Sequence, residues 1–263
     1  MKSLNKHKSI KMDKYYIKYD IDKHIATVEF YHPKSNSFPS AQLHEMVKIL
    51  DELGKNDEVK IIVLKSAGNK VFSAGASFDE LLSIQSFEEG KKFFMGFANV
   101  IMAMRRCPKF IVGCITGKVV GGGVGLASAC DYAFADASAS IRLSELSIGI
   151  GPFVIEPAIT RKIAITAFSE MTMNPKEWKS PEWAKEKGIY NQVFEDAESC
   201  EKSVQEFAKN LSIYSLEAMR DLKSIFWKET EDWKEVMPKR AEMSGHLVLS
   251  DFTRETLMKF KNK

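Results

Sequence analysis

The sequence has only four cysteines among 263 residues, and none of them forms a CxxC pair. Cysteines this sparse do not form a disulfide framework, so we expect free thiols in a reducing, cytoplasmic compartment. The five histidines show no metal-ligand spacing either, which argues against a zinc site. The four cysteines are Cys107, Cys114, Cys130 and Cys200.

An excess of one charge and a long apolar run are also absent. The 38 Lys and Arg residues nearly balance the 35 Asp and Glu residues, for a net charge of +3, so neither a disordered chain nor a nucleic-acid-coating protein is expected. No stretch approaches the roughly 18 apolar residues of a membrane span. With 44% hydrophobic residues, the chain predicts a globular protein with a large core and no membrane partner.

The order of the elements predicts an α/β protein in three parts. Residues 1–18 are rich in lysine and lack an apolar stretch, which indicates a flexible basic leader rather than a secretion signal. Strand-like and helix-like runs alternate over residues 19–195, and amphipathic helices alone follow over residues 196–263. The expected strands are 25–30, 59–64, 110–116, 132–135 and 139–143, and the expected helices are 40–54, 87–106, 121–130, 203–211, 216–226 and 252–260.

Two glycine-containing loops each follow a strand and precede a helix. They are the segments 72–78 (FSAGASF) and 117–125 (GKVVGGGVG). The first amides of a helix have no intrahelical partner, and glycine allows close approach, so such a loop suits a phosphate or an oxyanion. A tight contact between helix and sheet explains a bare GGG equally well. The GxGxxG, P-loop and GxSxG motifs are all absent.

Three segments in order resemble the enoyl-CoA hydratase/isomerase (crotonase) superfamily. They are FSAGASF, then GGGVGLASACDYAFAD, then RLSELSIGIGPF. The resemblance runs from about Asp20 to the C-terminus and includes HPKSNSF. It implies an α/β crotonase (ClpP-like) spiral of ββα units with a C-terminal helical trimerisation region. The implied partners are an acyl-CoA thioester and copies of the same chain, in a homotrimer or a dimer of trimers.

The resemblance also implies a site. The family holds the thioester carbonyl between two backbone N–H groups, which fall on Ala76 and Gly122, and stabilises an enolate there. Coenzyme A is part of the substrate, so no separate cofactor and no metal are implied. The residues that correspond to the coenzyme A path are Lys34, Ser35, Ala74, Ala76, Ser77, Phe78 and Asp79, together with Phe260, which matches an aromatic residue approaching from a neighbouring subunit.

The family's two carboxylates fall on position 125, which is glycine here, and on Glu145. Glu145 is therefore the expected acid/base, with a pKa raised by an apolar pocket. One carboxylate favours moving a double bond from C3–C4 to C2–C3, whereas hydration usually uses two. Phe153 replaces the Asp of the dienoyl-CoA isomerases, which argues against that activity.

Alternatives remain. Hydration of 2-enoyl-CoA by Glu145 alone is the closest, and an acyl-CoA-binding relative without turnover is another. Glu156 is a reserve carboxylate, although its place beside Pro157 is typical of an acid at a helix N-terminus.

Overall fold

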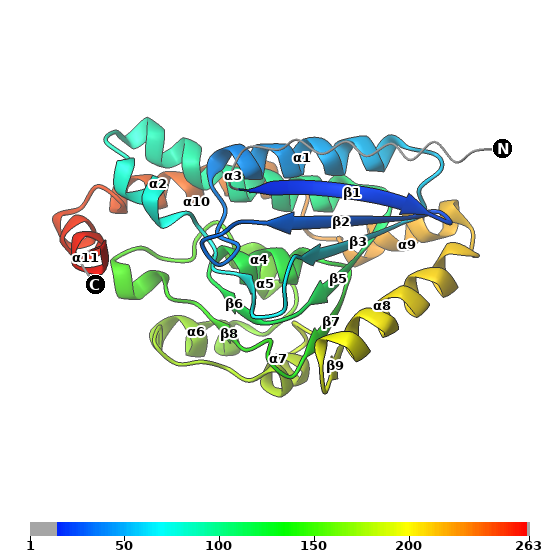
Figure 1. The fold of residues 1–263 in the computed structure, drawn as a ribbon. Helices are drawn as coiled ribbons and strands as arrows, with labels where there is room; N and C mark the ends of the chain where they lie inside the picture. The colour runs from blue at the N-terminus through cyan, green and yellow to red at the C-terminus, as the bar shows by residue number, and fades with distance from the viewer. Residues whose placement is uncertain (1–14, 262–263) are drawn as a thin grey trace.

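The core of the structure is a six-stranded sheet. The computed structural model describes residues 15–261, and the strand order is β1-β2-β3-β5-β7-β9 (Figure 1). β1 is antiparallel to β2, and all the other neighbours are parallel. The strands are β1 (Tyr16–Asp22), β2 (Ile25–Tyr31), β3 (Ile61–Ser66), β5 (Phe110–Ile115), β7 (Tyr132–Asp136) and β9 (Gln192–Phe194).

A second, smaller sheet lies in the order β4-β6-β8, with all its strands parallel. Its strands are β4 (Val71–Ser73), β6 (Lys118–Val120) and β8 (Ile141–Arg142). Helix α4 (Gly122–Ala129) begins directly after β6, and all of its residues are buried. The glycine-rich segment therefore starts the central helix of the molecule.

Two long helices cover one side of the main sheet. α1 (Ser40–Lys55) buries Leu43, Met46 and Leu50, which recur at helical spacing. α3 (Phe87–Arg106) has the predicted bounds, because the Ser86 side chain accepts a hydrogen bond from the Glu89 amide at its start. The shorter helices are α2 (Phe78–Ser83), the 3-10 turn η1 (Glu145–Ile148), α5 (Glu156–Thr160), α6 (Ile165–Met173) and α7 (Pro181–Lys187).

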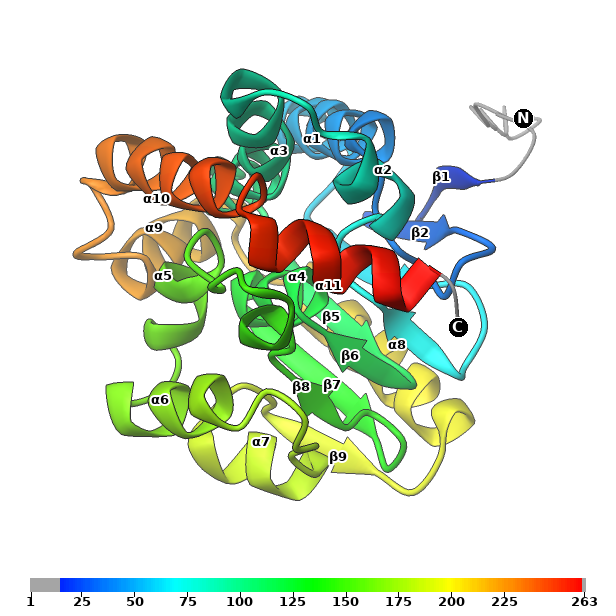
Figure 2. The ribbon, with the colours of Figure 1, turned by 90° about the vertical axis from the view of Figure 1, so that its left-hand side faces the viewer.

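The C-terminal helices pack back on this core. α8 (Ala197–Ser212) adds Val204 and Ala208 to an apolar cluster with residues of β3, β5 and β7. α10 (Trp233–Leu247) crosses α3 so closely that a Cβ on Gly90 would lie 3.0 Å from the Gly245 Cα. α11 (Asp251–Lys261) contacts α2 and η1 (Figure 2). The other helix of this group is α9 (Leu216–Phe226).

The structure confirms the α/β class and the helical C-terminal part, and it shifts some boundaries. β1 begins at Tyr16, inside the segment predicted as a leader, whose first 14 residues lie outside the described part. β3 runs over Ile61–Ser66 rather than 59–64. All four cysteines are free, as predicted, and all four are buried. Over residues 15–261, no helix is long and apolar enough to cross a membrane.

Candidate active site

A cavity of about 670 Å³ opens where the two glycine loops, η1 and the C-terminal helices meet. One part of its wall is apolar and the other carries polar and charged side chains. Among the lining residues within 15–261, Glu145 is the only carboxylate. The large apolar lining residues are Phe78, Leu81, Phe94, Phe97, Ile148, Ile150, Phe153, Val154, Ile155 and Phe260, and the polar ones are Arg142, Ser144, Glu145, Ser147, Lys176, Ser244, Thr256 and Lys259.

Glu145 is the first residue of η1, which follows β8 closely. Its Oε2 atom is buried and has no hydrogen-bond partner. Desolvation by this burial raises the pKa of Glu145 from 4.5 to about 7, against smaller opposing effects of backbone amides and Arg142. A carboxyl with this pKa can both accept and return a proton near neutral pH.

Gly121 makes room for this carboxylate. A Cβ built at position 121 would lie 2.7 Å from Glu145 Oε1, and the backbone there has φ +53°. Both facts require glycine, since a side chain would collide with Glu145 and disfavour the positive φ. The Gly121 amide also donates to the Arg142 carbonyl over 2.9 Å, which fixes the loop to β8.

Two backbone amides are free at the junction of the glycine loops. Ala76 forms a parallel bridge with Phe38 in which Phe38 N donates to Gly75 and Ser77 N donates to Phe38, so the N–H of Ala76 points the other way. Gly122 is the first residue of α4, and its N–H has no intrahelical acceptor. Ala76 and Gly122 both line the cavity.

Gly75 holds the two loops together. A Cβ at this position would lie 2.8 Å from the Val120 carbonyl oxygen and 3.0 Å from the Gly122 amide nitrogen, so only a glycine permits this approach. The Ser73 hydroxyl accepts from the Gly75 amide and donates to the Asn36 carbonyl, which fixes the shape of the first loop. The spacing of the two free amides therefore depends on backbone packing.

The position of the family's other carboxylate is filled by an aliphatic side chain. A Cβ at Gly125 would lie 2.6 Å from the Ile155 Cβ. Glu156 does not take over this place, because it is absent from the cavity lining and pairs instead with Arg240 of α10 at 3.1 Å. It also accepts a hydrogen bond from Thr160. Glu156 thus links α5 to α10, in agreement with the helix-start interpretation.

The residues matched to the coenzyme A path lie around the first loop, and half of them line the cavity. Lys34 forms an exposed ion pair with Asp79, and the Ser35 carbonyl accepts from the Ala74 amide. Ser77 caps α2 by accepting from the Glu80 amide. The cavity-lining members are Ala74, Ala76, Phe78 and Phe260, whereas Lys34, Ser35, Ser77 and Asp79 are not among the lining residues.

Phe260 contacts the first loop of its own chain. Its ring packs edge-on against Phe78, at 6.3 Å between centroids, because α11 turns back over α2 and η1 (Figure 2). Its approach to the site of a neighbouring subunit stays a prediction.

Sequence reasoning missed Arg142, Lys176 and the α10 residue Ser244, which also line the cavity. Arg142 stands in the quoted segment RLSELSIGIGPF and is the one with a visible signal, a cation in an otherwise apolar strand. Across residues 15–261, no group of histidine, cysteine, aspartate or glutamate side chains could hold a metal ion.

Solved structures share this fold. An enoyl-CoA hydratase from Bacillus halodurans superposes with a TM-score of 0.86 at 18% identity, covering 92% of this chain and 99% of that one. A putative enoyl-CoA hydratase from Mycobacterium avium paratuberculosis gives 0.83 at 22% identity, covering 94% and 96%. The architecture is therefore the crotonase fold.

A family model described as "Enoyl-CoA hydratase/isomerase" matches residues 20–263. The chain belongs to the enoyl-CoA hydratase/isomerase family, and the resemblance seen in the sequence is confirmed. A short-chain-enoyl-CoA hydratase of Clostridium acetobutylicum is 28% identical over 176 residues, 66% of this chain and 67% of that protein. A trans-2-decenoyl-[acyl-carrier-protein] isomerase of Streptococcus mutans is 26% identical over 262 residues, 96% of this chain and 97% of that protein.

Proposed function

We propose that this protein isomerises 3-enoyl thioesters to 2-enoyl thioesters, with Glu145 as the only acid/base. The observation that carries this proposal is that the described part of the chain places a single carboxylate in the cavity lining, with Ile155 in the place where a second would begin. Isomerisation needs one base that removes a proton from C2 and returns it at C4. Hydration also requires a group that positions and activates water.

The geometry supports a mechanism in which one carboxylate moves the proton and no cofactor takes part. The Glu145 carboxylate takes the C2 proton, and the electron pair delocalises onto the thioester oxygen as a dienolate. The N–H groups of Ala76 and Gly122 are the proposed donors to that oxygen, and loss of one such donor typically costs about 3–4 kcal/mol in the barrier. The protonated Glu145 then donates to C4, which leaves the double bond at C2–C3 and restores the carboxylate.

The Streptococcus mutans relative supports an isomerase, since it is named an isomerase of a trans-2-enoyl thioester and the alignment covers 96% of this chain and 97% of that protein. The name of that relative specifies an acyl-carrier-protein thioester, so for this chain the proposed substrate is an acyl thioester, with coenzyme A as the first carrier to test. Hydration is the second candidate, because relatives such as the Clostridium acetobutylicum protein are named hydratases.

The oligomer stays a proposal as well. The proposed assembly is a homotrimer or a dimer of trimers. Apolar side chains exposed on the C-terminal helices support association between copies of the chain, since large exposed apolar surfaces mark interfaces. Examples are Ile225, Phe252 and Met258, whose exposed fractions are 59%, 62% and 52%. Light scattering of the purified protein measures the subunit number directly.

The test of function offers 3-enoyl-CoA and 2-enoyl-CoA to the purified protein in separate assays. Isomerase activity predicts turnover of the first to the 2-enoyl product and no 3-hydroxy product from the second. Glu145→Gln is expected to lower kcat by about 10²–10⁴-fold. Glu156→Gln is the matched control and retains activity, because Glu156 lies outside the cavity lining.

Formation of 3-hydroxyacyl-CoA from 2-enoyl-CoA would show that the protein is a hydratase and would overturn the proposed isomerisation. Binding of both esters without turnover of either would identify an acyl-thioester-binding protein.

A further inference from the structure

The cavity contains a cation without a partner. Arg142 is half-buried at the end of β8 and lines the cavity, and its Nε atom is buried without a hydrogen bond. Within residues 15–261, no hydrogen bond or ion pair engages its side chain, which stacks instead on the Trp178 ring. A buried N–H group without an acceptor is costly, because nothing replaces the water that it has lost.

The Trp178 ring holds the guanidinium in place. The Arg142 Cζ atom lies 4.4 Å from the centre of this ring, within the range of a cation–π contact. This contact engages none of the guanidinium N–H groups in a hydrogen bond, so they stay available for an acceptor. Arg142 is therefore fixed in position with its hydrogen-bonding capacity unused.

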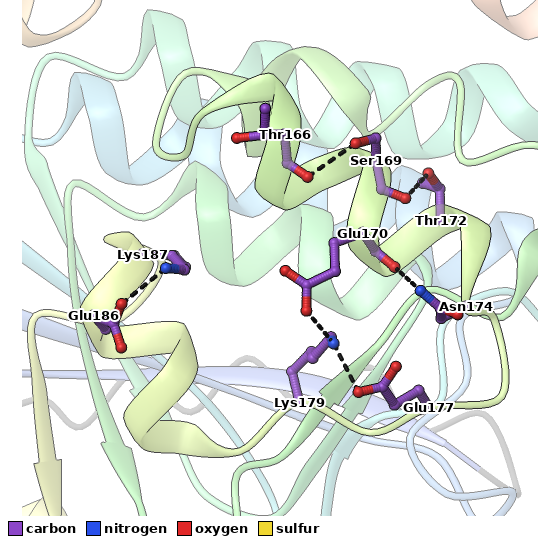
Figure 3. A network of polar contacts seen from close by, with 9 residues as sticks. All are labelled: Thr166, Ser169, Glu170, Thr172, Asn174, Glu177, Lys179, Glu186 and Lys187. Carbon is purple, nitrogen blue, oxygen red and sulfur yellow. Dashed lines mark hydrogen bonds and ion pairs between the residues drawn. The ribbon is translucent and has the colours of Figure 1, made fainter.

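The segment that carries Trp178 is itself attached to β8. Lys179 and Ile141 exchange two backbone hydrogen bonds, each of 2.9 Å, beside Arg142. The Lys179 side chain is only 7% exposed and lies between the carboxylates of Glu170 and Glu177 (Figure 3). This network fixes the chain next to Trp178.

Glu145 is not the partner of Arg142. The Glu145 Oε2 and Arg142 Nε atoms are both buried without a hydrogen bond, and burial keeps the pKa of Glu145 raised despite the opposing effect of Arg142. A purely aliphatic acyl chain offers nothing that satisfies a guanidinium. An acyl chain that ends in a carboxylate does, because a carboxylate and a guanidinium can form two parallel hydrogen bonds.

We propose that Arg142 binds a carboxylate at the far end of a short acyl chain, so that the substrates are CoA-type monothioesters of dicarboxylic acids. This rests on the proposed function in that the acyl thioester occupies the same cavity. We propose a short chain because the Arg142 carbonyl accepts directly from Gly121, the residue before the proposed donor Gly122, which limits the guanidinium to about the length of one arginine side chain from that donor. Lys176, which also lines the cavity, adds positive charge.

The test measures binding rather than turnover, so its result can be interpreted even if the protein does not isomerise enoyl thioesters. Glutaryl-CoA and pentanoyl-CoA have acyl chains of equal length that end in a carboxylate or a methyl group, and neither carries a double bond to isomerise. Calorimetry is expected to show about 10- to 100-fold tighter binding of glutaryl-CoA, in line with a charge-assisted hydrogen bond. Equal affinity of the two esters in the unchanged protein would overturn the proposal.

Arg142→Gln is expected to remove this preference, and Arg142→Lys to keep part of it. Lys118→Gln is the matched control, because Lys118 lies 5.1 Å from the same Trp178 ring but does not line the cavity. A preference that survives in Arg142→Gln contradicts the assignment. So does an equal loss of affinity for free coenzyme A, which would place the guanidinium on a phosphate.

If Arg142→Gln fails to fold, a comparison of Arg142→Lys with the unchanged protein still tests the proposal. Because lysine offers a point charge without the planar fork, the proposal predicts a smaller preference in the lysine variant than in the unchanged protein. An identical preference in both contradicts it.

Discussion

The Ile155 side chain occupies the space that a side chain at position 125 would need, since a Cβ at Gly125 would lie 2.5 Å from the Ile155 Cγ2 atom. The absence of a carboxylate at position 125 is thus built into the packing of α4 against the start of α5. Restoring that carboxylate requires two changes.

We expect Gly125→Glu to destabilise the protein by about 1–3 kcal/mol, because it overpacks the contact with Ile155. Ile155→Gly also destabilises by about 2–5 kcal/mol, because it leaves a void. The double variant is expected to lose less stability than the two single variants together, because removal of the Ile155 side chain makes room for the side chain at position 125. Urea unfolding of the four proteins measures this coupling, and additive losses would show that the two positions do not compete.

The raised pKa of Glu145 predicts how stability depends on pH. A carboxyl with a folded-state pKa of about 7 and an unfolded value near 4.5 favours folding when protonated. Its contribution is fully present below about pH 4.5 and is lost as the pH rises through 7. The free energy of unfolding of Glu145→Gln, minus that of the unchanged protein, is therefore expected to increase by about 2–3 kcal/mol from pH 5 to pH 8. Denaturant titrations at several pH values test this, and a constant difference would contradict the raised pKa.

The same group predicts the pH dependence of activity. The proposed base acts as a carboxylate, so kcat/KM is expected to rise with pH and to level off above about 7. A profile already flat from pH 5 upward would show that the carboxyl of the free protein ionises at its ordinary value.

The Lys34–Asp79 ion pair predicts that variants of its two partners change acyl-CoA binding in opposite directions. Both side chains are exposed, at 62% and 65%, so the pair contributes little to stability. If Lys34 attracts a coenzyme A phosphate, Lys34→Gln weakens acyl-CoA binding, whereas Asp79→Asn frees the lysine and tightens it. Each change is expected to be about 2- to 5-fold and to shrink at high salt.

Lys187→Gln is the control for this pair, because Lys187 pairs with Glu186 on α7 and does not line the cavity. Changes of the same sign in the Lys34 and Asp79 variants would contradict a role in phosphate binding.

The position of Phe260 predicts the outcome of subunit mixing. Phe260 lines the cavity of its own chain, so Phe260→Ala is expected to weaken acyl-CoA binding there. Coexpression of Phe260→Ala with Glu145→Gln chains is expected to give no recovery of activity. Recovery would show that an intact Phe260 from one subunit serves the Glu145 of another.

The helices and strands that the sequence predicted share strong local signals. α3 has a serine cap at one end and Pro108 beyond the other, so both of its bounds were predictable. α10 was missed because Pro238 interrupts its pattern, although the helix continues through it. β4 and β6 were missed because strands this short show no periodicity.

The site residues also fall into those with a local sequence signal and those without one. Glu145 and the two glycine loops lie within contiguous motifs, so the resemblance placed them. The stacking of Arg142 on Trp178 depends on the pairing of Ile141 with Lys179, and the direction of Phe260 depends on where α11 turns. Neither relationship has a local signal, because both arise from contacts between segments far apart in the sequence.

The crossing of α3 and α10 limits how this enzyme can change its acyl preference. At Gly90 and Gly245 the main chains of the two helices approach so closely that a Cβ on Gly90 would lie 3.0 Å from the Gly245 Cα and 3.1 Å from the Val248 side chain. Ser244, next to this crossing, lines the cavity. The wall there is rigid, so a larger or smaller acyl group is accommodated by exchanging side chains such as Phe94 or Val154, not by sliding one helix along the other.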